Sequence, residues 1–269
     1  MPRLDGKVAV ILGAAATDNM GQVMARLFAK EGARVVVGGR HAEPLRAIAD
    51  EVGGRYALCD ITRKTDVEQL AKTAADAYGK VDIAVNCTGW GLMAKLLETT
   101  EEQIERLTAL QFKGPYFFLQ VFVGSMAGSG GGSVIQISSA SVHALLYNHA
   151  AYIGTKAGSE ALVRCFANEF GAKGVRVNAI APGLTGTPMT DNEMRMPGLQ
   201  EAFLKEYPLG RIGTTQDVAD AALWLAGDEC FMTGQVLQVN GGLTLRRNPS
   251  PREINASMRE KAAQAAKGG

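Results

Sequence analysis

Short apolar segments of strand length alternate with longer amphipathic segments along most of the chain. The apolar segments are hydrophobic at nearly every position, which is typical of strands that helices cover on both faces. Strands that alternate with helices indicate right-handed βαβ units, and these build a doubly wound parallel sheet. We therefore predict an α/β fold with a single sheet of about seven strands and helices on both faces.

The same pattern places each predicted element. Strands are expected at Val8–Leu12, Val35–Val37, Tyr56–Leu58, Val81–Val85, Val134–Ile137, Val175–Ile180 and Val236–Val239. Helices are expected at Gly21–Glu31, Glu43–Val52, Thr65–Tyr78, Glu101–Val123, Ala151–Phe170 and Gln216–Leu225.

Two stretches depart from this alternation. The segment from Pro182 to Pro208 is rich in Pro, Gly and Met and is long for a connector. Adaptable Met side chains suit a lid over an apolar ligand, and a helical pair packed on the core is the alternative. The charged, Ala-rich end of the chain predicts a terminal helix or a frayed end. We therefore expect one domain at 1–245, with a substrate lid at 183–208, and a polar C-terminal extension at 246–269.

Charge and cysteine content argue against several classes of function. The 28 basic and 27 acidic residues nearly cancel, which disfavours nucleic acid or an anionic membrane as the main partner. The apolar segments are shorter than the ~20 residues that cross a bilayer, and the first residues do not resemble a signal peptide, so a cytoplasmic protein is expected. The scattered cysteines predict buried free thiols rather than a metal site: Cys59, Cys87, Cys165 and Cys230.

A run of small residues, Gly13 to Gly21, follows the first predicted strand. Small residues allow the backbone to approach a pyrophosphate, and the next helix N-terminus supplies N–H groups and a partial positive charge. Between the first strand and first helix of a βαβ chain, such a loop indicates a dinucleotide site. A tight turn without a ligand is the alternative.

The end of the second strand bears on which dinucleotide binds. Val35–Val37 is followed by Gly38, Gly39 and Arg40. In dinucleotide folds an acidic residue near this point binds the ribose 2′-hydroxyl of NAD, whereas an arginine accommodates the 2′-phosphate of NADP. We expect NADP in preference to NAD, because a guanidinium suits a phosphate. A solvated loop charge is the alternative for Arg40.

Tyr152 and Lys156 form the most informative short motif. On a predicted helix, their spacing of four residues places them on one face. A nearby ammonium would lower the pKa of the phenol from its ordinary ~10, which suits proton exchange with a carbonyl or alcohol oxygen. Alone, such a pair arises by chance in roughly one chain of this size in four, and a packed ring beside a solvated lysine is then the simpler interpretation.

Together with further motifs in the same order, these features resemble the short-chain dehydrogenase/reductase family over residues 5–244. Ser139 precedes Tyr152 by thirteen residues, the family's usual interval for its catalytic serine. Asn86-Cys87-Thr88-Gly89 stands where the family has Asn-Asn-Ala-Gly. The resemblance implies a single-domain, Rossmann-like fold. It also implies catalytic roles for Ser139, Tyr152 and Lys156, and for Gln111 in the place of the family's Asn.

The resemblance further implies where a nicotinamide cofactor binds. Asp60-Ile61 resembles the residues that face the adenine, and Pro182-Gly183 with Thr187 resembles the turn that contacts the nicotinamide carboxamide. The implied cofactor-binding residues are Gly13, Ala15, Asn19, Met20, Gly21, Arg40, Asp60, Ile61, Asn86, Thr88, Gly89, Tyr152, Lys156, Pro182, Gly183, Thr185 and Thr187.

Several departures from the family pattern affect the site. The glycine loop is two residues longer than usual, as in the enoyl-reductase branch, and Asn19 replaces the middle glycine. Asp18 would be unfavourable near a phosphate unless it points away. Gln111 would either hold or displace the water that links Lys156 to solvent. Cys87 is expected to be a packed thiol rather than a nucleophile.

The implied activity is hydride transfer between a nicotinamide cofactor and a carbonyl or secondary alcohol. Tyr152 would be the general acid in reduction and the general base in oxidation. Lys156 would lower its pKa and bind the nicotinamide ribose, and Ser139 would hydrogen-bond the substrate oxygen. An enoyl reductase acting on a thioester and a nucleotide-binding regulator without turnover are the alternatives.

Loops at the carboxyl ends of the strands should line the substrate pocket. His143 and His149 would either tune this pocket or be surface-loop histidines. The resemblance also implies a homotetramer or homodimer built through the helices Glu101–Val123 and Ala151–Phe170. The candidate lining is mostly apolar, which predicts a hydrophobic small-molecule substrate: Trp90, Leu92, Met93, Val142, His143, Leu145, Tyr147, His149, Leu184, Met189 and Met194.

Overall fold

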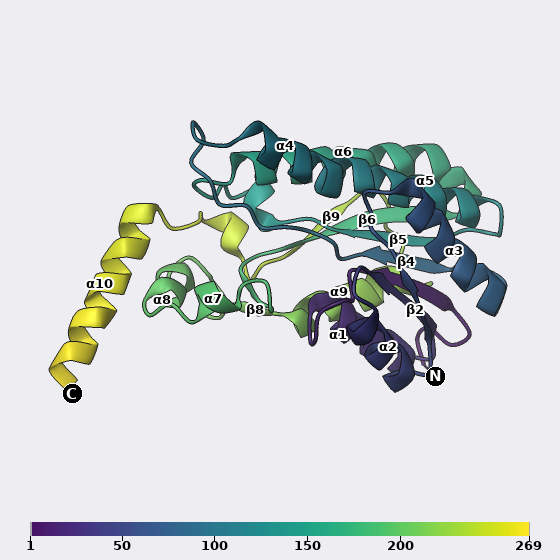
Figure 1. Ribbon diagram of the computed structural model, residues 1–269, viewed down its shortest axis with the longest axis horizontal. Coiled ribbons are helices and arrows are strands. Elements are labelled where there is room, and N and C mark those ends of the chain that lie inside the picture. Colours follow the sequence, from purple (N-terminus) through teal and green to yellow (C-terminus); the bar gives the residue numbers. More distant parts are fainter. Residues whose placement is uncertain (1, 269) are drawn as a thin grey trace.

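The computed structural model describes residues 2–268, and in them seven parallel strands form one sheet in the order β3-β2-β1-β4-β5-β6-β9. The predicted doubly wound sheet is therefore confirmed (Figure 1). Strand order reverses between β1 and β4, the kind of position where ligands bind in open α/β sheets. The strands are β1 (Val8–Leu12), β2 (Arg34–Gly39), β3 (Arg55–Leu58), β4 (Ile83–Asn86), β5 (Gly132–Ile137), β6 (Val175–Pro182) and β9 (Val236–Val239).

Helices cover both faces of the sheet, as Figure 1 shows. Every residue of β1 is buried, which explains why its sequence is continuously apolar. No helix among residues 2–268 combines the length and apolar character needed to cross a bilayer. One face carries α1 (Met20–Lys30), α2 (Ala42–Glu51) and α9 (Thr215–Ala226), and the other carries α3 (Lys64–Tyr78), α5 (Gly114–Ala127) and α6 (Ala150–Phe170).

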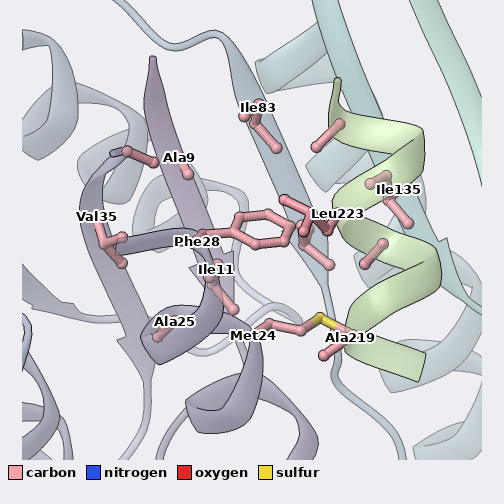
Figure 2. Close-up of a cluster of buried hydrophobic side chains, with 14 of the residues drawn as sticks. Ala9, Ile11, Met24, Ala25, Phe28, Val35, Ile83, Ile135, Ala219 and Leu223 are labelled. Atoms are coloured by element: carbon pink, nitrogen blue, oxygen red, sulfur yellow. The ribbon is translucent and has the colours of Figure 1, made fainter. Parts of the chain in front are cut away.

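The core on the first face centres on Phe28 of α1. Its ring points toward Leu223 of α9, and Met24, one turn earlier, points toward Ala219 (Figure 2). Phe28 and Met24 are fully buried, as is Ile11 of β1 in the same cluster. This packing fixes α1, whose N-terminus follows the glycine loop.

The helix expected at Glu101–Val123 is interrupted. Residues 109–113 form a π-helical turn between α4 (Glu101–Thr108) and α5. Pro115 has no N–H to donate to the carbonyl of Gln111 four residues earlier, so a regular α-helical ladder cannot pass this point. The widened turn carries the buried Gln111. Such π-turns are frequent at functional sites.

The predicted lid and the C-terminal segment lie at one end of the molecule (Figure 1). Strand β7 (Thr185–Gly186) pairs with β8 (Gly213–Thr214). Two short helices follow β7, namely α7 (Asp191–Met194) and α8 (Leu199–Leu204). The end of the chain forms a helix, α10 (Pro251–Gly268), rather than a frayed segment.

The C-terminal segment contacts both the lid and the loop after β5. Lys261 of α10 forms an ion pair with Glu201 of α8 at 3.0 Å. Gly198 lies so close to α10 that a Cβ there would come within 2.6 Å of its backbone. The Asn248 side chain donates a hydrogen bond to the main-chain carbonyl of Ala144 at 2.5 Å. These contacts join the lid, the tail and the loop after β5.

Candidate active site

The carboxyl ends of the central strands meet at one edge of the sheet. Leu12 at the end of β1 pairs with Gly38 of β2 and Asn86 of β4, and Asn86 pairs with Gln136 of β5. The glycine loop, the turn after Asn86 and the segment that carries Ser139 therefore begin side by side. In parallel α/β sheets this edge is where ligands bind.

Ser139, Tyr152 and Lys156 lie together at this edge. Ser139 follows β5 by two residues, and Tyr152 and Lys156 occupy the first turns of α6. The Ser139 hydroxyl lies near the Tyr152 phenol and acts to lower its pKa, and it hydrogen-bonds the Ser141 hydroxyl at 2.9 Å. The Lys156 ammonium lies 6.0 Å from the centre of the Tyr152 ring and donates to the main-chain carbonyl of Ile137 at 2.6 Å. The fold thus brings the residues after β5 next to the first turns of α6.

Burial controls the ionisation of both Tyr152 and Lys156. Desolvation raises the pKa of Tyr152, and the nearby Ser139 hydroxyl offsets this only in part. The expected lowering of this pKa by Lys156 is therefore wrong, because the ammonium lies beside the ring and binds a main-chain carbonyl. Desolvation also lowers the pKa of Lys156 to about 8, although Cys87 and Glu160 oppose the shift.

Gln111 connects the loop after β4 to α6. Its side-chain Oε1 accepts a hydrogen bond from the Trp90 N–H at 3.0 Å, and its Nε2 donates to the Thr155 hydroxyl at 3.0 Å. A Cβ placed on Gly89 would lie 3.5 Å from that Oε1 and 3.7 Å from Nζ of Lys156. Gln111 therefore joins the loop after β4 to α6 through hydrogen bonds, next to Lys156, and both ends of its amide have protein partners.

The glycine loop is closed by tight backbone contacts. Gly13 has a φ of +103°, and a Cβ there would come within 2.9 Å of the Cys87 backbone. A Cβ on Gly21 would come within 2.8 Å of the Gly13 carbonyl oxygen, so both positions need glycine. The Asn19 side chain accepts from the Gln22 N–H at 3.0 Å and donates to the Gly13 carbonyl at 2.8 Å. Asn19 therefore caps α1 and shapes the loop.

Asp18 stands beside a candidate phosphate site, where a carboxylate directed at the phosphate would be unfavourable, and an arginine holds it instead. Its carboxylate pairs with Arg26 of α1 at 2.9 Å. The residue adopts a φ of 54°, in the left-handed region, which Asp tolerates better than most side chains. Arg26 also pairs with Glu51 at 2.7 Å, so the one carboxylate in the glycine loop shares this guanidinium with a second acid.

Arg40 and Asp60 follow neighbouring strands. Arg40 is exposed directly after β2. Asp60 accepts hydrogen bonds from the main-chain N–H and the hydroxyl of Thr62 at 3.0 and 2.8 Å. Desolvation acts to raise the pKa of Asp60, but the Thr62 bonds and the charges of Arg40 and Arg63 outweigh it and lower the pKa. Ile61, the next residue, is buried.

The turn after β4 is organised by Asn86. Its side chain donates to Oε1 of Gln136 at 2.8 Å and accepts from the N–H and hydroxyl of Thr88 at 3.0 and 2.7 Å. The Cys87 thiol contacts the Met24 sulfur at 3.7 Å, and burial raises its pKa to about 12. These properties fit a packed thiol rather than a nucleophile.

The turn at Pro182 and Gly183 is held by Tyr207, a residue that the sequence analysis did not single out. The Leu184 N–H donates to the Tyr207 hydroxyl oxygen at 2.6 Å. A Cβ on Gly183 would come within 2.4 Å of that oxygen. Thr185, which is buried, donates its hydroxyl to the Gly183 carbonyl at 3.0 Å. No local pattern marks Tyr207, because its contact depends on the lid folding back on the turn.

Comparison with known proteins identifies the family. A family profile described as "Enoyl-(Acyl carrier protein) reductase" matches residues 13–244. The solved structure of a short-chain type dehydrogenase/reductase from Mycobacterium ulcerans superposes with a TM-score of 0.87 and 29% identity, covering 95% of this chain and 98% of that one. The chain belongs to the short-chain dehydrogenase/reductase family.

Curated relatives of this dehydrogenase/reductase are named for the reduction of a carbonyl group or the oxidation of an alcohol. The 3-oxoacyl-(acyl-carrier-protein) reductase FabG of Thermotoga maritima is 33% identical over 252 residues, covering 90% of this chain and 100% of that one. The mitochondrial borneol dehydrogenase of Lavandula x intermedia is 35% identical over 246 residues, covering 90% and 92%. The protein is an oxidoreductase that acts on alcohol or carbonyl groups with a nicotinamide cofactor.

Several of the apolar side chains predicted to line the substrate pocket are exposed on loops. Met93, Leu145, Tyr147 and Met189 are exposed, and they come from the loops after β4 and β5 and from the lid. The first two loops are joined by a hydrogen bond from the Ala94 N–H to the Asn148 carbonyl at 2.8 Å. Figure 1 places both loops and the lid at the same edge of the sheet.

Other predicted lining residues have different partners. The Arg106 guanidinium stacks over the Trp90 ring at 4.0 Å. His149 approaches the Tyr152 ring edge-on, with ring centres 6.1 Å apart. His143 was expected in the pocket or on a surface loop, but its Nε2 lies 3.3 Å from a carboxylate oxygen of Glu160. His143 is 40% exposed, which fits the surface-loop alternative, whereas its pairing with Glu160 of α6 was not predicted, because no local pattern relates the two.

Proposed function

We propose that this oxidoreductase reduces the carbonyl group of a hydrophobic substrate with NADPH, with Tyr152 as the general acid. The contact between Ser139 and Tyr152, with Lys156 beside the ring, carries this proposal. Burial raises the pKa of Tyr152, so the phenol keeps its proton at neutral pH and is available as a donor.

The residues at the sheet edge fit a nicotinamide dinucleotide. Gly13 and Gly21 keep side chains out of the first loop, and the Asp18 carboxylate is paired with Arg26 rather than directed at a phosphate. The absence of a side chain on Gly89 leaves room beside the Lys156 ammonium, where ribose hydroxyls would bind. When bound, a nicotinamide supplies the hydride.

Each catalytic side chain then has one task in reduction. Tyr152 donates its phenolic proton to the substrate oxygen as negative charge develops there. Ser139, whose hydroxyl lies near the phenol, donates to the same oxygen and stabilises that charge. Lys156 holds the cofactor ribose, because its ammonium can donate to ribose hydroxyls. Gln111 holds the loop after β4 against α6 beside Lys156.

Loss of the Lys156 proton should limit the reaction at alkaline pH. The pKa of about 8 means that the ammonium is present at lower pH and disappears as the pH rises through 8. We expect kcat/KM for carbonyl reduction to fall by about tenfold per pH unit above that value. A pH–rate profile at constant ionic strength measures this, and a profile that stays flat to about pH 10 would contradict the prediction.

Arg40 supports the proposed preference for NADP. Replacing it with Ser should raise KM for NADPH by about 10- to 100-fold and leave KM for NADH unchanged, because the guanidinium would bind only the 2′-phosphate. Initial rates with both cofactors measure the effect. Arg34→Ser is a matched control, since Arg34 is exposed at the opposite end of the same strand. Equal effects of Arg40→Ser on both cofactors would refute the preference.

An enoyl reductase acting on a thioester is a second candidate. The description of the matching family profile and the lengthened glycine loop both favour it. The spacing of four residues between Tyr152 and Lys156 opposes it, since enoyl reductases resembling this chain in loop length separate that pair further. An NADPH-oxidation assay with a 2-enoyl thioester and with a ketone distinguishes them. Turnover of the thioester alone would establish the second candidate.

We also propose that the protein assembles as a homotetramer or homodimer through α4, α5 and α6. Ile104 of α4 and Tyr116 of α5 are large apolar residues that this chain by itself leaves exposed. Covering such a surface with a second copy would remove it from water. Size-exclusion chromatography with light scattering tests this, and a monomer at micromolar concentration would contradict it.

A further inference from the structure

Glu160 is a buried acidic residue that the proposed reaction does not use. It lies on α6 four residues after Lys156 and eight after Tyr152, so the three side chains follow one face of the helix. Its side chain is only 4% exposed. Because carboxylates are almost never buried without partners, the groups that contact Glu160 indicate its role.

The two oxygens of the Glu160 carboxylate hold opposite ends of one turn. The Ser138 hydroxyl donates to Oε1 at 2.5 Å, and Nε2 of His143 lies 3.3 Å from Oε2. Ser138 precedes Ser139 directly, and His143 follows Ser139 by four residues. One carboxylate therefore fixes the turn on both sides of the Ser139 hydroxyl.

Lys156 contacts the same segment one residue earlier. Its ammonium donates to the carbonyl of Ile137 at 2.6 Å, next to Ser138. Two successive turns of α6 thus bind two successive residues at the end of β5. This arrangement sets the position of Ser139 relative to Tyr152, which projects from the same helix.

Glu160 also acts on Lys156 through its charge. The ionisable groups that bear on the Lys156 ammonium are Glu160 from the same helix and Cys87 from the loop after β4. The Cys87 thiol is uncharged where Lys156 titrates, because burial raises its pKa to about 12, so the charge that favours the ammonium comes from Glu160. The groups that face Glu160 itself are Ser138 and His143, from the end of β5 and the loop after it.

We propose that Glu160 is a positioning residue of this active site. It holds the turn that carries Ser139 through Ser138 and His143, and its carboxylate stands one helical turn from the Lys156 ammonium. This inference rests on the roles proposed above for Ser139, Tyr152 and Lys156.

Glu160→Gln tests the role of the charge. The amide oxygen can still accept from Ser138, but the negative charge is gone. The alkaline limb of the pH profile for NADPH-dependent ketone reduction should move to lower pH by about one unit. Glu68→Gln is the matched control, because Glu68 is an exposed acid on α3, and its profile should overlay that of the unmodified enzyme. A Glu160→Gln profile that also overlays it would overturn the role of the charge.

A double-mutant cycle tests the positioning of Ser139 and remains usable if Glu160→Gln does not fold. His143 is 40% exposed, so His143→Asn should fold. We expect it to lower kcat about fivefold in the unmodified enzyme and less than twofold when Ser139 is already Ala, because its effect passes through Ser139. If His143→Asn lowered kcat by the same factor in both backgrounds, the proposed positioning of Ser139 through His143 would be overturned.

The outcome for Tyr152→Phe separates the two proposals. If that variant keeps near-normal turnover, the proposed mechanism fails, whatever Glu160 does. If Tyr152→Phe is inactive while neither Glu160→Gln nor His143→Asn gives the expected result, the mechanism stands and only the inference about Glu160 is lost.

Discussion

Replacing Tyr152 with Phe should lower kcat for carbonyl reduction by about a thousandfold. The change removes one hydroxyl, the group that lies near Ser139 and would protonate the substrate oxygen. The ring remains, so α6 and the contact with Lys156 should be preserved, and the Kd for NADPH should change less than about threefold. Stopped-flow or steady-state turnover with a screened ketone, together with fluorescence titration of NADPH, measures both quantities.

Tyr147→Phe is the companion variant for this test. Tyr147 is a second phenol among the residues predicted to line the substrate pocket. It is 60% exposed and has no lysine four residues later. Its kcat should fall no more than about threefold, as expected for a group that does not transfer the proton. If Tyr147→Phe were inactive and Tyr152→Phe active, the catalytic acid would have been assigned to the wrong phenol.

Phe28→Ala should lower the free energy of unfolding by about 3–5 kcal/mol, the cost of removing a large aromatic side chain from a packed core. The Phe28 side chain is 0% exposed and lies between α1 and α9 over the sheet (Figure 2). Its loss would leave a cavity that Met24 and Leu223 cannot fill without leaving their own contacts. Urea-induced unfolding followed by circular dichroism measures the change.

Leu58→Ala is the control for this stability prediction. Leu58 is 55% exposed on β3, at the edge of the sheet, so less apolar surface is lost when it is truncated. The expected cost is below about 1 kcal/mol. A Phe28→Ala protein as stable as Leu58→Ala would mean that the interface between α1 and α9 contributes little to the fold.

The sheet could be predicted from the chain because its strands are buried on both faces. Val8–Leu12 is apolar throughout, Val175–Ile180 is apolar except for Arg176 and Asn178, and the structure places strands there, the second extended to Pro182. The prediction of one regular α-helix at Glu101–Val123 was wrong, because a π-helical turn at residues 109–113 separates α4 from α5. Amphipathic spacing does not reveal that Pro115 withholds the N–H that the Gln111 carbonyl needs, although Pro115 itself is visible in the sequence.

The candidate site could be predicted only as a set of residues. Sequence order placed Ser139, Tyr152 and Lys156 in one group, and the fold brings them to one edge of the sheet. Motif spacing could not show that Asn19 caps α1, nor that Tyr207 holds the turn after β6. Both contacts depend on where a side chain points once the loop has closed.

The sequence by itself determined the parallel α/β architecture, the family and the residues proposed to carry the chemistry, because these depend on periodicity and on motifs of fixed spacing. Only the tertiary structure decided how those residues behave. Burial raises the pKa of Tyr152 where a neighbouring lysine alone would lower it. Glu160 holds the turn around Ser139. Both effects depend on the desolvation and the contacts of groups that meet only after folding, which linear spacing does not encode.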